Sequence, residues 1–429
     1  MLSRRVVLTG LGAAAALLAL PAAAPAQGGA LVVNTTIDAP PSTPMIEACI
    51  LGDGSCTLRA AIAAAATLPG PSTITFAPGL SGGTIALTQG SLTVTTPLTI
   101  QGPGATLLTI DGSAGVADGI IDDESPSLSV SGLTLANGSA ADGLFDQEGG
   151  GAIQQTAGDL TVTGVAFTGN SSGPGNVGGA IYAAGDSTVV SGSVFTDNTS
   201  AGGIEDSEGG AIYLGSGTLT VDGSTFTGNR AATEGGAIEI EGAGTTINGS
   251  TFTNNAAGYD GGGAIDVESG SLRITSSNFT ANTAPQGGIV VNFAGGDTET
   301  LTITGSHITS NTNSSAPGAD GAMVVNVYGT LIVANTLIEN NVGPSIGGIY
   351  AGDAQLTNVT VTGNTAAGAC DVGCAGGVRL GDATIAGSVI EGNTGGPFSP
   401  NCSFYGTVTD GGGNTLAPDC QAAIAAPSP

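Results

Sequence analysis

The stretch STFTGNRAATEGGAI, residues 224–238, contains two short motifs that recur along the chain. In the first motif, an apolar residue stands three places before an asparagine, and here the pair is Phe226 and Asn229. The other copies are Phe167/Asn170, Phe195/Asn198, Phe252/Asn255, Phe279/Asn282, Ile308/Asn311, Ile338/Asn341, Val361/Asn364 and Ile390/Asn393. The mean step between copies is about 28 residues, a period typical of stacked supersecondary units.

The second motif is a glycine pair followed by a short alternating stretch. It reads GGAIQQ at 150–155, GGAIYA at 178–183, GGAIYL at 209–214, GGAIEI at 235–240 and GGAIDV at 262–267. A second strand is expected after each copy, as in GTLTVDGSTF at 217–226, where Leu219 and Val221 share one face. Helical periodicity is absent from these repeats, so they predict an all-β structure.

A 28-residue period with short strands favours one coil of a β-solenoid over a propeller blade, which needs four strands. Stacked coils would place the phenylalanines in one buried column, each contributing about 2–3 kcal/mol when enclosed. The asparagines would form a hydrogen-bonded ladder at the next corner. Glycine pairs suit the corner after that, where the backbone turns tightly. The repeated motifs are therefore interpreted as structural.

The paired motifs resemble the repeats of polymorphic outer-membrane proteins and of pectin-lyase-like right-handed parallel β-helix proteins. The resemblance covers residues 150–396, with weaker coils from about residue 86. It implies an all-β, single-stranded right-handed parallel β-helix with a short N-terminal capping helix. It does not imply one activity, because lyases, hydrolases, adhesins and phage proteins share this fold.

The segment CTLRAAIAAAATL at 56–68, preceded by LVVNTTID at 31–38, resembles the CSLREA domain that opens many bacterial surface β-helix proteins. Thr57 and Ala60 depart from that pattern, where serine and glutamate are usual. The segment predicts a strand, a disulfide loop and a short helix whose Leu58 and Ile62 cover the open end of the first coil. The expected divisions are a leader at 1–26, an N-terminal cap at 27–85, coils at 86–397 and a C-terminal cap at 398–429.

The N-terminus predicts export. Arg4 and Arg5 precede a short apolar run in a pattern that resembles a twin-arginine signal, with a general secretory signal as the alternative. The cysteines form three local pairs, which in an exported protein predict disulfides. The pairs are Cys49/Cys56, Cys370/Cys374 and Cys402/Cys420. We expect a secreted monomer, soluble or loosely associated with the cell surface, with no transmembrane anchor.

The chain has a net charge of −28 and no lysine. This balance argues against nucleic acid and anionic membranes as partners, because both require clustered basic residues. With His307 as the only histidine, a structural zinc site is not expected. His307 stands just before the inward residue of its coil and should point outward, and Arg59 is expected to hydrogen-bond within the cap.

Acidic residues gather at the corner of variable length between the asparagine and the next glycine pair. They are Asp142, Asp146, Glu148, Glu205, Asp206, Glu208, Glu234 and Asp260. In stacked coils these carboxylates would form a stripe along one edge, and hard oxygen ligands of this kind bind Ca²⁺. The alternative is a solvated charged edge, because no fixed ligand spacing recurs. The sequence leaves the identity of any metal open.

We expect a non-catalytic β-helix that has a structural or adhesive role and contacts glycans or cell surfaces through this acidic corner. The alternative is a glycoside hydrolase or polysaccharide lyase on the same fold, with Asp122 and Asp123 as its candidate catalytic residues. Adjacent residues of a strand point to opposite faces, which weighs against that pair. Asp353 and Gln355 also interrupt the threonine column that an ice-binding face would need.

Overall fold

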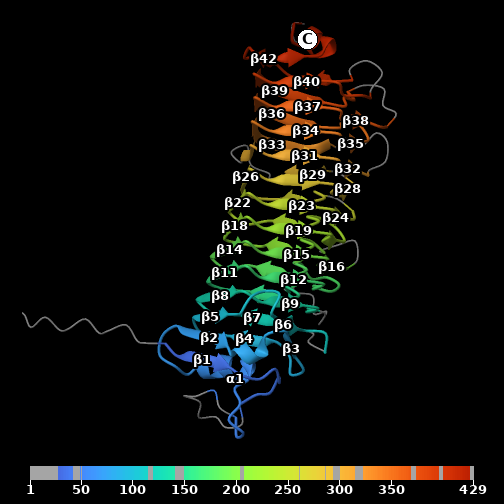
Figure 1. Ribbon diagram of the computed structural model, residues 1–429. Helices are drawn as coiled ribbons and strands as arrows, with labels where there is room; N and C mark the ends of the chain where they lie inside the picture. The colour runs from blue at the N-terminus through green and yellow to red at the C-terminus, as the bar shows by residue number, and fades with distance from the viewer. Residues whose placement is uncertain are drawn as a thin grey trace, which may run out of the picture.

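The computed structural model describes residues 28–41, 49, 51–114, 119–140, 149–202, 207–259, 261–285, 287–292, 300–314, 322–368, 373–395 and 400–425. Its chain winds into coils that stack along one axis, from β1 at one end to β42 near the other (Figure 1). All strand pairings between coils are parallel, for example β11 with β14 and β14 with β18. Parallel crossovers are almost always right-handed. The expected right-handed parallel β-helix is confirmed.

Three parallel sheets form the sides of the solenoid, and the first is the widest. Most coils contribute two strands to it, which merge into one long strand in β33, β36 and β39. Its strands are β1 (Ala30–Val33), β2 (Ser72–Phe76), β4 (Leu92–Val94), β5 (Leu98–Gln101), β7 (Ile121–Asp123), β8 (Ser127–Ser131), β10 (Ile153–Gln155), β11 (Asp159–Thr163), β13 (Ile181–Ala183), β14 (Ser187–Ser191), β17 (Ile212–Leu214), β18 (Thr218–Asp222), β21 (Ile238–Ile240), β22 (Gly244–Asn248), β25 (Ile265–Val267), β26 (Ser271–Thr275), β29 (Gly287–Asn292), β30 (Thr300–Thr304), β33 (Ala322–Ala334), β36 (Ile349–Thr357), β39 (Val378–Ala386), β41 (Cys402–Phe404) and β42 (Val408–Asp410).

The second sheet takes one short strand from each coil and carries the phenylalanines. Its strands are β3 (Gly83–Ala86), β6 (Leu108–Asp111), β9 (Thr134–Ala136), β12 (Ala166–Thr168), β15 (Val194–Thr196), β19 (Thr225–Thr227), β23 (Thr251–Thr253), β27 (Asn278–Thr280), β31 (His307–Thr309), β34 (Leu337–Glu339), β37 (Thr360–Thr362), β40 (Val389–Glu391) and β43 (Thr415–Leu416). The third sheet follows the asparagine corner. It contains β16 (Thr199–Ser200), β20 (Arg230–Ala231), β24 (Ala256–Ala257), β28 (Thr283–Ala284), β32 (Thr312–Asn313), β35 (Val342–Gly343) and β38 (Thr365–Ala366).

The phenylalanine column and the asparagine ladder are both confirmed. Phe167, Phe195, Phe226, Phe252 and Phe279 are fully buried, and successive rings stack with centroids 4.6–4.8 Å apart. Each asparagine amide donates to the side-chain oxygen of the asparagine one coil later. The ladder runs through Asn170, Asn198, Asn229, Asn255, Asn282, Asn311, Asn341, Asn364, Asn393 and Asn401, with donor–acceptor distances of 2.8–3.2 Å.

The glycine pairs stand where neighbouring coils approach most closely. Gly209 has a positive φ of 60°, a conformation that costs side-chain-bearing residues strain. A Cβ atom on Gly210 would lie only 2.2 Å from the carbonyl oxygen of Gly236 in the next coil. The glycines therefore let the first sheet begin directly after the corner without separating the coils.

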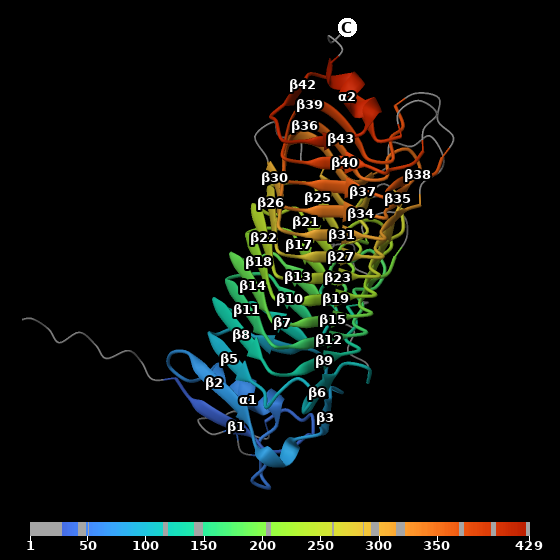
Figure 2. The ribbon, with the colours of Figure 1, turned by 45° about the horizontal axis from the view of Figure 1, so that its top comes forward.

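The N-terminal end is covered by α1 (Leu58–Ala65), which begins at the N-cap Thr57 and buries Leu58 and Ile62 against the core. Figure 2 shows this helix beside β1 and β2 at the end of the stack. The side chain of Arg59 donates to Asp38 at 2.7 Å and to the carbonyl oxygens of Gly90 and Ser91. Arg59 thus connects the helix to the turn before β4, as expected.

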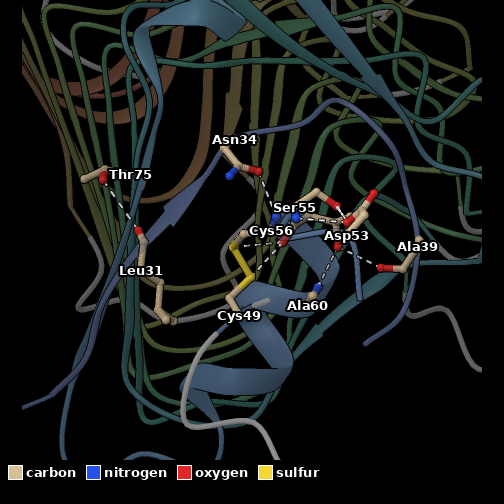
Figure 3. The surroundings of a disulfide bond; sticks show 10 residues. Leu31, Asn34, Ala39, Cys49, Asp53, Ser55, Cys56, Ala60 and Thr75 are labelled. Carbon is tan, nitrogen blue, oxygen red and sulfur yellow. Dashed lines mark hydrogen bonds between the residues drawn. A yellow bond between two sulfur atoms is a disulfide. The ribbon is translucent and has the colours of Figure 1, made fainter. Parts of the chain in front are cut away.

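Two of the expected disulfides, Cys49–Cys56 and Cys402–Cys420, are formed. Figure 3 shows the first beside α1, where the side-chain oxygen of Asn34 accepts from the backbone nitrogen of Cys56 at 2.7 Å. Cys374 is also disulfide-bonded, whereas Cys370 lies outside the described residues. The Cys402–Cys420 bridge ties α2 to β41.

The C-terminal end contains a helix that the sequence analysis did not predict, α2 (Pro418–Ala425). Its residue Asp419 accepts from the amide of Asn401 at 3.1 Å, and so ends the asparagine ladder. The short 3₁₀ helix η1 (Pro78–Leu80) precedes β3. Among the described residues, no helix is long and apolar enough to cross a membrane.

Candidate functional site

The acidic corner is only partly within the described residues. Asp142, Asp146, Glu148, Glu205, Asp206 and Asp260 lie outside them, while Glu208 and Glu234 lie directly before the glycines that lead into β17 and β21. Both of these side chains are partly buried. The two glutamates lie close to further carboxylates that the sequence analysis did not single out.

Those carboxylates belong to the outward side of β21 and β25, which stack next to each other (Figure 2). Glu239 of β21 stands in register with Asp266 of β25. The same position holds Tyr182 and Tyr213 in the two preceding coils. Although outward, Glu239 and Asp266 are 0% and 1% exposed, because the corner folds over this part of the sheet.

Three of the carboxylates converge. Oxygen atoms of Glu234, Asp266 and Glu268 all lie within 4.8 Å of one another. Glu234 comes from the corner, Asp266 from β25, and Glu268 from the turn after that strand. The backbone nitrogen of Gly262 donates to Asp266 at 3.0 Å. We call these three residues together with Glu239 the acid cluster.

Glu239 is the most unusual member of the acid cluster. Neither of its carboxylate oxygens has a hydrogen-bond partner. Burial raises its pKa well above the ordinary value, and the charges of Asp266, Glu208 and Glu234 raise it further. Burial also raises the pKa of the Tyr213 hydroxyl, with added effects from nearby glutamates including Glu239. The cluster therefore concentrates negative charge around one buried carboxylate.

A second site is a groove of about 430 Å³ on the outer face of the first sheet, near its C-terminal end. It lies over β33, β36, β39 and β42, the uppermost strands of this sheet in Figure 1. The lining residues are Thr330, Asp353, Ala354, Gln355, Asp382, Ala383, Thr384, Thr407 and Thr409. We call it the C-terminal groove.

Two carboxylates face the C-terminal groove from neighbouring coils. Asp353 of β36 and Asp382 of β39 stand in register, and so do Gln355 and Thr384. Asp382 accepts from the backbone nitrogen of Thr407 at 2.7 Å, which holds its carboxylate toward the groove. Both aspartates are exposed. The groove thus presents acceptors, an amide and hydroxyl groups on a rigid sheet.

Aromatic rings lie beside these aspartates. Tyr405 is 53% exposed, and its hydroxyl donates to the carbonyl oxygen of Ala351 at 3.0 Å. The Arg379 guanidinium lies 5.6 Å from the ring centroid of Tyr405 and 5.5 Å from that of Tyr350. Burial raises the pKa of Tyr405, as do Tyr350 and the charge of Asp353. This places an aromatic surface at the edge of the groove.

The structure places Asp122 and Asp123 on opposite sides of β7. Asp122 shares the outward position of Gln154, whereas Asp123 points into the solenoid and is fully buried. One oxygen of Asp123 accepts from the backbone and hydroxyl of Ser125 at 3.1 and 2.6 Å, and the other has no partner. The two carboxylates therefore do not face a common substrate.

The buried Asp123 predicts a pH dependence of stability. Burial raises its pKa from 3.8 to about 6, and the charge of Asp122 adds to the shift. Because the folded state holds this proton more tightly, Asp123 contributes about 3 kcal/mol of stability below pH 3.8, and this contribution is lost as the pH rises through about 6. Denaturant titrations should show that Asp123→Asn removes this decline. An equal decline in Asp123→Asn and in the exposed control Asp159→Asn would contradict the assignment.

His307 points outward, as expected. Its Nε2 atom lies 3.0 Å from a carboxylate oxygen of Glu339 in the next coil, and its side chain is 42% exposed. No other titratable partner of His307 is observed among the described residues. The histidine therefore belongs to a surface pair between β31 and β34 of the second sheet, whereas the acid cluster and the C-terminal groove lie on the first sheet.

The sequence does contain signals for both sites. The groove aspartates stand in a repeated Gly-Asp-Ala, at 352–354 and 381–383. The buried acids stand directly after the motif Gly-Gly-Ala-Ile in only two copies, as Glu239 and Asp266. Aligning the coils residue by residue would have brought each pair together, since parallel register conserves position.

No curated protein matches the chain. Among solved structures, the A-module of the mannuronan C-5 epimerase AlgE6 from Azotobacter vinelandii is similar over 84% of this chain and 94% of that chain. The sequence identity is 16% and the TM-score is 0.34. A family model for the right handed beta helix region matches residues 150–326 and 209–395, which together span more than half of the chain. The protein therefore belongs to the right-handed β-helix family.

Proposed function

We propose that this protein is an exported glycan-binding β-helix and that its saccharide ligand lies in the C-terminal groove. The observation that carries the proposal is the in-register pair Asp353 and Asp382, flanked by Gln355, Thr384 and the exposed ring of Tyr405. Carboxylates and amides accept hydrogen bonds from sugar hydroxyls, and an aromatic ring offers a flat apolar surface beside them. Preorganised polar groups on a rigid scaffold are typical of ligand sites.

The charge of the protein narrows the ligand class. A net charge of −28 repels polyuronates and other anionic polymers, whereas neutral glycans are not affected. The two aspartates add to this selection within the groove. We therefore infer that the ligand is a neutral glycan. We further propose that the protein binds it outside the cell as a monomer that carries a CSLREA-like N-terminal segment and is exported by its twin-arginine-like leader.

The proposal is tested with a panel of neutral and anionic glycans and the folded chain after its leader, residues 27–429. Calorimetry should detect binding to a neutral glycan, and Asp353→Asn and Asp382→Asn, each made singly, should weaken it by about tenfold to a hundredfold. Each lost charge-assisted hydrogen bond is worth about 1.5–3 kcal/mol, and tenfold in affinity is 1.4 kcal/mol.

A matched control exists in the same column of the first sheet. Asp159, at the start of β11, occupies the position that Asp353 and Asp382 occupy several coils later. Like them, Asp159 is exposed. Asp159→Asn should leave glycan binding unchanged. Equal losses in Asp159→Asn and in the groove variants would show a general charge effect and would refute a site in the groove.

The same aspartates favour a second candidate, glycoside hydrolysis. Neighbouring parallel strands lie about 4.8 Å apart, close to the carboxyl separation of about 5–5.5 Å in retaining glycosidases. Incubation with neutral glycans followed by assay of new reducing ends separates the two candidates. Release that stops in Asp353→Asn or Asp382→Asn would assign hydrolysis to the groove, and binding without release would assign recognition alone.

A further inference from the structure

The acid cluster on β21 and β25 is unlike an ordinary solvated edge. Surface carboxylates spread apart into water, yet oxygens of Glu234, Asp266 and Glu268 converge within 4.8 Å. Asp266 is 1% exposed and is held in place by a bond from the backbone nitrogen of Gly262. Like charges held this close repel one another strongly when water is excluded.

Glu239 supplies an independent observation. It is fully buried, it stands in register with Asp266, and both of its carboxylate oxygens lack a hydrogen-bond partner. A Cβ atom on Gly235, the residue after Glu234, would lie 2.7 Å from one of these oxygens, so the carboxylate lies directly under the corner. Leaving such a polar group buried and unpaired is costly unless something compensates it.

The atoms that the acid cluster offers as ligands indicate which group could compensate its buried charge. The cluster offers carboxylate oxygens and includes neither histidine nor cysteine, a donor set suited to a hard divalent cation. Calcium–oxygen distances are about 2.3–2.6 Å, so ligand oxygens on opposite sides of one ion lie about 4.6–5.2 Å apart. Oxygen atoms of the three converging carboxylates, all within 4.8 Å of one another, are close enough together to contact one such ion.

We propose that Glu234, Asp266 and Glu268 bind a calcium ion whose charge also neutralises the buried carboxylate of Glu239. Such an ion would connect the corner before β21 to β25 in the next coil, and thereby fasten two coils together. The site is separate from the C-terminal groove, so this proposal does not depend on glycan binding. Of the two corner acids that lie within the described residues, Glu208 and Glu234, the second belongs to this site.

The first experiment measures calcium binding to the full folded chain by calorimetry, after removal of bound metal with a chelator. One site is expected, together with a rise in the thermal unfolding midpoint on addition of millimolar calcium. Glu268→Gln should weaken calcium binding by at least about tenfold. Glu268 is exposed, so this variant should fold normally. Glu391→Gln, an exposed glutamate of β40, is the matched control and should bind as the parent does.

Glu239→Gln gives a second readout that a merely structural residue would not show. In chelator this variant should have a higher unfolding midpoint than the parent, because the buried charge is gone, while its gain from calcium should shrink. No calcium binding at millimolar concentration, or unchanged binding in Glu268→Gln, would overturn the proposal. So would an equal midpoint rise with magnesium at the same ionic strength, which would show screening of the acidic surface instead.

Discussion

Replacing Phe226 with alanine is expected to lower the free energy of unfolding by about 3–5 kcal/mol, the usual cost of emptying a large buried aromatic site. Phe226 is fully buried in the middle of the ring column, with its centroid 4.6 Å from that of Phe195 and 4.7 Å from that of Phe252. The alanine would therefore leave a cavity between two rings that the backbone spacing of the coils prevents from closing.

The loss should depend on position within the column. Phe279 stacks on Phe252 on one side, while its neighbour on the other side is Ile308, so Phe279→Ala removes only one ring pair. Each such pair contributes about 0.5–1.5 kcal/mol beyond burial. Denaturant unfolding and amide hydrogen exchange in the flanking coils would measure both variants. Equal losses at Phe226 and Phe279, or a loss below 1 kcal/mol at Phe226, would show that ring stacking does not stabilise the column.

The part of the fold predictable from sequence is the part that repeats. Phe226 and Asn229 recur because the same inward position must be filled in every coil, and a parallel stack conserves register. Asn401 lies outside this pattern. It follows Asn393 by eight residues, yet it continues the ladder because Asp419 of α2 accepts its amide. A contact made once, by a segment without repeats, leaves no periodic signal in the sequence.

The candidate sites were harder to predict because strand alternation gives the direction of a side chain but not what covers it. Alternation correctly places Glu239 and Asp266 outward, where exposure would be expected. They are buried because the corner covers this column of side chains. In the preceding coils, Val177 covers the same column where it packs with Tyr182 and Tyr213. The length and the path of the corner differ between coils, so the repeated motifs do not predict which outward side chains the corner covers.

Asp353 and Asp382 show the opposite case. Both are exposed, and no packing requirement constrains an exposed position of the sheet. The two aspartates are neighbours only because their coils stack in register, and the segment between them in the sequence does not show this. Their pairing becomes evident only when β36 is aligned with β39. In the sequence, Asp353 is notable only because it interrupts, with Gln355, a column of threonines, and Asp382 is not singled out at all.

Asn229→Ala is expected to reduce stability by about 4–6 kcal/mol, since each buried polar group left without a partner costs about 1–3 kcal/mol. The Asn229 side chain accepts from the backbone nitrogen and the amide of Asn198 at 3.1 and 2.9 Å. It donates to the carbonyl oxygen of Phe195 at 3.1 Å and to Asn255 at 2.9 Å. Alanine removes all four bonds at a position with no access for water.

The matched comparison is Asn248→Ala, in an exposed row one sheet away. Asn248 also bonds along the stack, to Asp222 at 2.8 Å and from Thr275 at 2.8 Å, but water can replace these contacts. Its loss should stay below about 1 kcal/mol. Similar losses of stability for Asn248→Ala and Asn229→Ala in denaturant unfolding would show that the ladder stabilises the fold through the backbone preference of asparagine and not through its hydrogen bonds. A large difference would show that the recurring asparagine stabilises the solenoid because it satisfies buried backbone groups that the corner leaves unpaired.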